Sequence, residues 1–337
     1  MLLRLCVLLL TFSIAFAEPG LLVAEGGKVH QFDSQHRWQR AFSYGNEAKS
    51  RGLCASLQRV YVSVGDEVVA MDLLSGQVLW RTQLDAEPAD RLDLSEDGRL
   101  LFVPSGFARA SGSLLVLRAD TGELIHTYTD GVPGRAHNCL TLADTVYLTG
   151  RAGRSLCMLD PNTGQVKKQV GPFSGFLRPF CIAGGRAFVN VDGLLGFEVG
   201  DLESGKMLTS VTAKAAEVTH PGHHECPSHG IGISPDGREI CVVDSQGDRL
   251  LFFSSQAPYA PTASVAVGYD PGWVNYSLDG RYLYPSTGEV LDAHSKARVG
   301  WLVDKRGRLL QSEKILPIDW QDGRALEIRK QFALPKP

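Results

Sequence analysis

A Ser/Thr-Gly dipeptide recurs along this chain at a nearly constant interval and constrains the fold more than any other feature. Its copies are separated by 46, 42 and 41 residues and are Ser75-Gly76, Thr121-Gly122, Thr163-Gly164 and Ser204-Gly205. Each copy lies between two short apolar runs, and glycine supplies the positive φ that a tight hairpin turn needs. The chain is therefore predicted to repeat a strand–turn–strand unit.

A second hairpin signal lies upstream of these turns. Ser-x-Asp-Gly sequences, at residues 95–98, 234–237 and 277–280, each precede another short apolar run. Asp-Gly after a serine is strong turn chemistry. Both hairpins in one frame give units of four strands, and these units begin near Arg51, Arg91, His137, Arg178, His229 and Trp273.

The two ends of the chain supply a seventh unit. Residues 21–43 read as three strands without a preceding inner strand, and residues 315–334 read as the segment that completes their sheet. Joining the ends removes the exposed strand edges that a linear array would leave. We therefore predict one all-β domain, residues 18–337, folded as a seven-bladed β-propeller of four-stranded antiparallel blades. A ring of six or eight blades is the alternative.

The first residues resemble an export signal. A basic residue, Arg4, lies in an apolar stretch from residue 2 to 16 that ends in Ala15-Phe16-Ala17. A short apolar run before a small-x-small pattern is typical of a cleaved signal peptide and is too short to span a bilayer. We expect residues 1–17 to be removed and the mature protein to be periplasmic or extracellular, with no membrane span.

Composition limits the partners of the chain. The formal net charge of −3 and the pI near 6.3 provide no basic surface for nucleic acid or anionic lipid. We expect a monomer that binds a small molecule. Six cysteines follow the signal segment, and three of them lie in short apolar runs at similar repeat positions. Buried free thiols are favoured over disulfides, which an even number of cysteines would also allow.

Residues 228–244, SHGIGISPDGREICVVD, resemble the repeat of the bacterial YVTN-type propellers, with weaker copies at 91–103 and 273–285. These exported proteins are related in fold to the lactonase-like seven-bladed propellers. The resemblance implies the architecture and leaves the function open among lactonase-like enzymes, lyases and non-enzymatic proteins.

Residues 71–80, MDLLSGQVLW, are similar to the blade motif of quinoprotein dehydrogenases, in which a glycine and a tryptophan dock neighbouring blades. The tryptophan occurs in one blade only, and the other blades have Ile125, Val166 and Met207 in that region. The resemblance makes a quinone-dependent dehydrogenase the third functional hypothesis.

The densest polar cluster is the segment from His220 to His229, HPGHHECPSH, which holds four of the nine histidines. It lies between the last strand of one blade and the first strand of the next, near the central channel. Imidazole is a common ligand of divalent metals. We predict metal ligands among His223, His224 and His229, with Glu225 as a ligand or base. A polar loop facing solvent is the alternative.

Alignment of the repeats places two further residues at the position of His229. His137 and Arg178 stand where His229 stands in its own blade, so His137 is a fourth candidate ligand and Arg178 a candidate for an anionic group. The sequence does not distinguish zinc, copper, calcium and magnesium.

Two classes of function follow. The first is a metal-dependent hydrolase, such as a lactonase, or a lyase, with His229, Glu225 and Arg178 as catalytic residues acting on a small anionic molecule. The second is a propeller that binds a ligand or protein without catalysis, since propellers host many activities.

Overall fold

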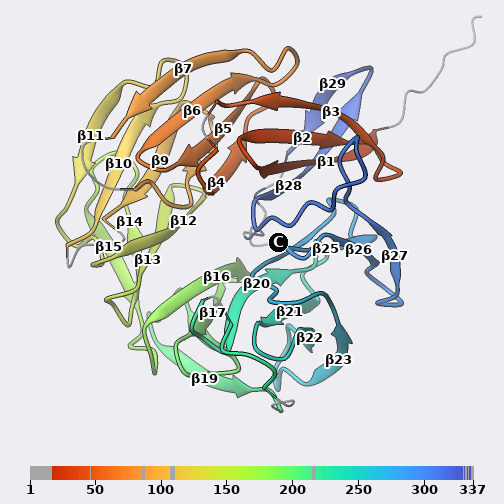
Figure 1. Cartoon of the computed structure of the whole chain (residues 1–337). Helices are drawn as coiled ribbons and strands as arrows, with labels where there is room; N and C mark the ends of the chain where they lie inside the picture. Colours follow the sequence, from red (N-terminus) through yellow and green to blue (C-terminus); the bar gives the residue numbers. More distant parts are fainter. Residues whose placement is uncertain are drawn as a thin grey trace, which may run out of the picture.

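Seven β-sheets surround a central channel in the computed structural model of the chain (Figure 1). It describes residues 17–45, 47–84, 88–106, 111–214, 218–222, 224–328, 330, 332 and 334. These residues form strands β1 to β29, and every pairing between named strands is antiparallel. The predicted all-β, seven-bladed propeller is confirmed.

Six blades each contain four consecutive strands, with the first strand innermost. The first three of these blades comprise β4 (Ser50–Ala55), β5 (Arg59–Val64), β6 (Glu67–Asp72) and β7 (Val78–Gln83); β8 (Asp93–Leu94), β9 (Leu100–Ser105), β10 (Ser113–Arg118) and β11 (Leu124–Tyr128); and β12 (Ala136–Leu142), β13 (Thr145–Gly150), β14 (Leu156–Leu159) and β15 (Val166–Val170).

The next three blades follow the same plan. They comprise β16 (Leu177–Ala183), β17 (Arg186–Val191), β18 (Gly196–Asp201) and β19 (Met207–Thr212); β20 (Ser228–Ile233), β21 (Glu239–Asp244), β22 (Arg249–Ser254) and β23 (Pro261–Ala266); and β24 (Val274–Tyr276), β25 (Tyr282–Pro285), β26 (Glu289–Asp292) and β27 (Arg298–Trp301). All six blades begin within two residues of the predicted starts.

The seventh blade joins the two ends of the chain. Strands β1 (Glu18–Glu25), β2 (Lys28–Phe32) and β3 (Trp38–Ser43) pair with the C-terminal β28 (Ile315–Gln321), which is extended by β29 (Arg324–Glu327). The pairing of β1 with β28 runs from Glu18 opposite Trp320 to Val23 opposite Ile315. Ring closure by both ends is therefore confirmed, and this sheet has five strands instead of the four predicted for a blade.

The repeated turn glycines also dock the blades against one another. Gly76, Gly122 and Gly164 have φ of 72°, 76° and 70°, as the hairpin interpretation requires. A Cβ at Gly122 would lie 2.5 Å from the ring of Trp80 in the preceding blade. Phe42 lies against Gly76 in the same way, and Tyr128 lies against Gly164. Three successive blade interfaces thus each pack an aromatic ring on a glycine.

The interior consists of apolar clusters, most of which lie where neighbouring blades face one another, filled by alternate residues of the strands. The six described cysteines are free and buried, as the thiol interpretation predicted, and burial raises their pKa values. Among the described residues, the structure contains no helix with the length and apolar character needed to cross a membrane. The predicted signal peptide, residues 1–17, lies outside them except for Ala17.

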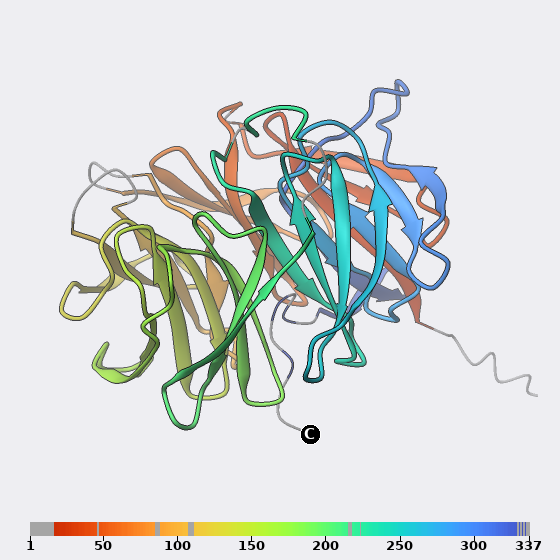
Figure 2. The same cartoon turned by 90° about the horizontal axis from the view of Figure 1, so that it is seen from below.

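Equivalent innermost strands give the ring two distinct mouths. Because each of the six blades formed by consecutive strands starts with its innermost strand, these strands run the same way along the channel. Figure 2 shows the blades side by side in a view turned by 90°. We call the end where the innermost strands begin the near mouth, and the end where they finish the far mouth. The predicted site residues His137, Arg178 and His229 all lie at the near mouth.

Candidate functional site

His229 is the most deeply buried histidine of the near mouth. It is the second residue of β20, and its side chain is 3% exposed. Its Nδ1 lies 3.0 Å from the carbonyl oxygen of Gly272 in the next blade, so this nitrogen donates a proton to that oxygen. Burial, with the neighbouring His224, holds the pKa of His229 well below its usual value. The ring is therefore neutral near pH 7, and its Nε2 carries a lone pair.

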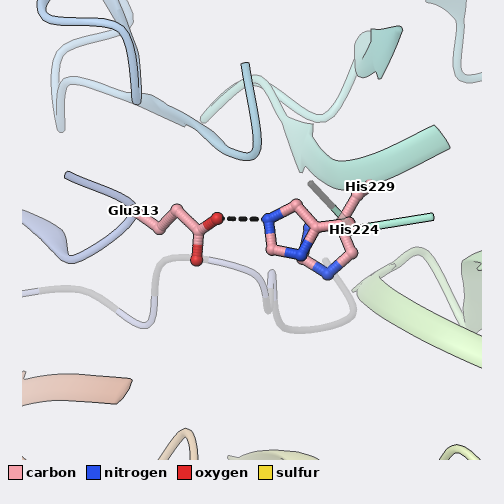
Figure 3. Close-up of side chains that lie close together, drawn as sticks. All are labelled: His224, His229 and Glu313. Atoms are coloured by element: carbon pink, nitrogen blue, oxygen red, sulfur yellow. Dashed lines mark hydrogen bonds and ion pairs between the residues drawn. The ribbon is translucent and has the colours of Figure 1, made fainter. Parts of the chain in front are cut away.

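His224 joins His229 to a carboxylate from the closing blade. The two rings stack face to face, with centroids 3.4 Å apart and planes 4° from parallel. On its other side, Nε2 of His224 lies 2.5 Å from Oε1 of Glu313, two residues before β28 (Figure 3). One ligand atom from each of these residues lies within 4.8 Å of the others. We call His224, His229 and Glu313 the His-Glu cluster.

A buried cation, Lys314, and a half-buried one, Arg91, accompany the His-Glu cluster. Nζ of Lys314 lies 3.0 Å from Oε2 of Glu313, and burial lowers the pKa of Lys314 to about 8. The guanidinium of Arg91 lies over the ring of Trp273 at 3.3 Å and donates to the carbonyl oxygen of Glu313. Burial also lowers the pKa of Arg91, to about 10. Positive charge is thus available to an anion beside the carboxylate.

His137 lies beside the cluster without joining it. Its ring centroid is 6.3 Å from that of His229, and its Nδ1 lies 2.6 Å from Oδ2 of Asp90. Burial raises the pKa of Asp90, but the contact with His137 and the charges of Arg51 and Lys314 together outweigh this and leave the pKa lowered. Asp90 and His137 therefore form a second charged or strongly polar pair at the near mouth.

An open cleft of about 510 Å³ adjoins the His-Glu cluster. It lies between the blades that contain β24, β28 and β4, and Glu313 and Lys314 form part of its wall. Hydroxyl side chains of Ser286, Thr287 and Ser312 also line it, together with the charged residues Glu25, Lys49 and Asp270. The volume is in the range of small-molecule sites in proteins.

The structure brings together only part of the predicted site. His224 and His229 meet, and His137 lies nearby. Glu225 is exposed and is not among the residues that could share an ion with them. Arg178 is buried but pairs with Asp192 of its own blade. His223 lies outside the described residues.

Four residues of the site were missed from the sequence: Asp90, Trp273, Glu313 and Lys314. Residues 311–314, QSEK, have the polar composition of a turn, and this composition alone indicates no role. A signal was available, because the residues that start the innermost strands ring the near mouth. The same rule applied to the closing blade selects the residues just before β28, namely Glu313 and Lys314.

The stacked rings limit what the cluster can do as it stands. Two ligand nitrogens bind one ion at ~2.0–2.1 Å along lone pairs that lie in the ring planes. Parallel planes 3.4 Å apart do not converge on such a point. His229 is already oriented with Nε2 available, so a shared ion requires the His224 ring to turn. The described residues of its loop, which include Pro221 and Gly222, form turns and bends and no regular strand.

Comparisons with known proteins agree on the fold. A family model described as outer membrane protein assembly factor BamB (PQQ_2) matches residues 21–171, somewhat less than half of the chain. This segment includes all three glycine–aromatic interfaces. No curated protein sequence matches the chain. Similarity to a β-propeller family is thus shown, whereas the more specific YVTN-type or lactonase-like membership stays a prediction.

Solved structures are similar at low identity. Hydrazine synthase of Kuenenia stuttgartiensis has a TM-score of 0.66 and 13% identity over 81% of this chain and 89% of that one. Dihydro-heme d1 dehydrogenase NirN, in complex with DHE, has a TM-score of 0.64 and 15% identity over 93% of this chain and 73% of that one. A functionally unknown protein of Desulfotomaculum acetoxidans DSM 771 has a TM-score of 0.67 and 13% identity over 88% of this chain and 98% of that one. Identities this low establish a shared fold alone.

Proposed function

We propose that this chain is an exported propeller that binds a divalent metal ion through His224, His229 and Glu313 at the near mouth. One observation carries the proposal: three ligand atoms, two imidazole nitrogens and a carboxylate oxygen, lie within 4.8 Å of one another beside an open cleft. Two histidines and a glutamate are a donor set of catalytic zinc sites. Imidazole ligands favour zinc or copper over calcium and magnesium.

Metal entry requires a defined local change. Glu313 exchanges its contact with His224 for the ion, and the His224 ring turns out of its stack with His229. Lys314 remains beside the carboxylate. His229 needs no change, because its bond to the Gly272 carbonyl already fixes which nitrogen is free.

The cleft suggests hydrolysis of a small anionic ester or lactone. A divalent ion held by His224, His229 and Glu313 would supply a Lewis acid that lowers the pKa of a bound water and polarises a carbonyl. Lys314, in the wall of the cleft, would supply positive charge for a carboxylate of the substrate. A lyase reaction is the alternative use of the same groups, with an imidazole removing the proton.

Metal analysis tests the proposal. Purified protein is expected to contain about one zinc or copper ion per chain, and Glu313→Gln and His229→Ala should lower the metal affinity by at least tenfold. His220→Ala is the matched control, because His220 pairs with Asp248 and stacks on Tyr269 outside the cluster. A folded wild-type protein without stoichiometric metal, and without zinc binding by calorimetry, refutes the proposal.

A second candidate function is ligand or protein binding without catalysis. The match of residues 21–171 to a model described as an outer membrane protein assembly factor favours it and also supports an exported location. Absence of metal from folded protein, together with co-purification of a defined partner, distinguishes it from the first. A quinone-dependent dehydrogenase ranks third, because only Trp80 provides the tryptophan of that motif.

A further inference from the structure

The far mouth of the channel is occupied by the C-terminal segment that follows β29. Ring closure does not need this segment, because β28 already pairs with β1 at six positions. The described residues Lys330, Phe332 and Leu334 nevertheless each contact the ring. We call these three residues the tail.

The tail forms backbone hydrogen bonds with the free edge of an innermost strand. Strand β16 is at the edge of its sheet and pairs on one side only, with β17. On its other side, the N–H of Ile182 donates to the carbonyl oxygen of Phe332 at 2.7 Å, and the N–H of Leu334 donates to that of Ile182 at 2.8 Å. These two bonds are the pattern of an extended peptide that lengthens a sheet by one strand.

Alternate side chains of the tail enter separate places on the ring. Nζ of Lys330 lies 2.9 Å from Oδ2 of Asp93 and also donates to the Leu94 carbonyl and to Thr141. The Phe332 ring is 7% exposed and meets the ring of Trp273 edge to face, with centroids 5.4 Å apart.

Leu334 packs against the same apolar cluster that contains Phe332. A cation, an aromatic and an aliphatic residue are thus bound at every second position, as the period of a strand requires.

Two cavities flank the tail. One, of about 370 Å³, is lined by Lys330 and Phe332, and the other, of about 920 Å³, by Lys330 and Leu334. Acidic residues Asp93, Glu96 and Asp97 line the first. The mouth is therefore a groove whose acidic rim and apolar floor are complementary to the basic and apolar tail that lies in it.

We propose that the far mouth is a strand-addition site for an extended peptide with a cation, an aromatic and an aliphatic residue at alternate positions. The chain's own tail fills the site in cis, and a partner segment of the same pattern exchanges with it. Backbone bonds to Ile182 provide the pairing, and the Asp93 and Trp273 sites provide the side-chain selection. The backbone pairing with Ile182 involves none of the proposed metal ligands, but Trp273 connects the two places, because its ring contacts Phe332 on one side and His229 on the other.

Competition between the tethered tail and a free peptide tests this inference in the full-length chain. A fluorescent peptide of residues 326–337 is titrated into wild-type protein and into Phe332→Ala. The tethered tail has a millimolar effective concentration, so wild-type protein should bind the peptide weakly. Loss of the Phe332 anchor should tighten peptide binding by about tenfold or more. Leu208→Ala, an exposed leucine on the outer strand β19, is the control and should behave as wild type.

Hydrogen exchange at one amide reports the binding mode. The Ile182 amide should exchange faster in Phe332→Ala and become protected again when the peptide is added. Lys330→Ala provides a second variant, because it removes the bond to Asp93 without removing apolar core. Equal peptide affinity for wild type and both variants, or an Ile182 amide that the peptide leaves unprotected, overturns the inference.

Discussion

Replacement of Gly272 by alanine is expected to disrupt the His-Glu cluster without altering its chemical groups. The φ of Gly272 is not in the left-handed region, so the backbone accepts alanine. A Cβ there would lie 2.3 Å from Oε1 of Glu313 and 2.7 Å from Nε2 of His224. Both distances are too short for real contacts, so the ends of both side chains must shift, and the hydrogen bond between them is expected to break.

The expected loss of stability in Gly272→Ala follows from the overpacking that the added Cβ causes. Overpacking of a filled interior costs about 1–3 kcal/mol in the free energy of unfolding. Displacement of two metal ligands should also lower zinc affinity by about 10–100-fold. Denaturant unfolding, read as a change of midpoint at constant slope, measures the first effect, and calorimetric titration with zinc measures the second.

Gly300→Ala is the matched control for this substitution. Gly300, in β27, has no left-handed φ, and a Cβ there would meet Val290 at an ordinary 3.7 Å. Its effect on stability should stay within about 0.5 kcal/mol, as for most surface substitutions. Wild-type stability together with wild-type zinc affinity in Gly272→Ala would refute the placement of Glu313 and His224 over this glycine.

Other regions give independent expectations. His30 is buried, and burial and the charge of Arg308 lower its pKa to about 4. The unfolded chain therefore binds one more proton below pH 6.5, and the free energy of unfolding should fall by up to about 1.4 kcal/mol per pH unit. Urea titrations at pH 7 and pH 5 should show a smaller loss of stability in His30→Gln than in the wild type. Gly122→Ala should cost more stability than Gly98→Ala, since both have positive φ but only the former meets the Trp80 ring; equal losses would count against aromatic docking of blades. Zinc at 100 times its dissociation constant should stabilise the fold by about 2.7 kcal/mol, an increment that Glu313→Gln, at the same zinc concentration, should reduce to about 1.4 kcal/mol or less in thermal scans.

Blade phasing could be predicted from the sequence because turn chemistry is local. The hairpins at Gly76, Gly122 and Gly164 can be predicted from the neighbouring residues alone, and all three glycines have positive φ in the structure. The aromatic partners were less predictable: Tyr128, rather than Ile125, meets Gly164, because contact across an interface depends on strand register in two blades at once.

The site was predictable only where it depended on one segment. His224 and His229 were identified from their cluster in the sequence, whereas Glu313 reaches them only because β28 closes the ring 89 residues after His224. Glu225 shows that a neighbour in the sequence need not belong to the same site. Its φ of 55° and its exposure set it apart from the group that its neighbour His224 joins.

Pairing of β1 with β28 also dictates an order of folding. The partner of the first strand to be synthesised is nearly the last, so the sheet of β1, β2 and β3 waits with an unpaired edge while the other six blades form. Contacts across such a sequence separation form slowly, because the loop must close before they stabilise anything. During that interval the apolar strand LLVA, residues 21–24, is the segment most exposed to aggregation. Completion of the last strand is thus the kinetic step at which a chaperone would protect this protein.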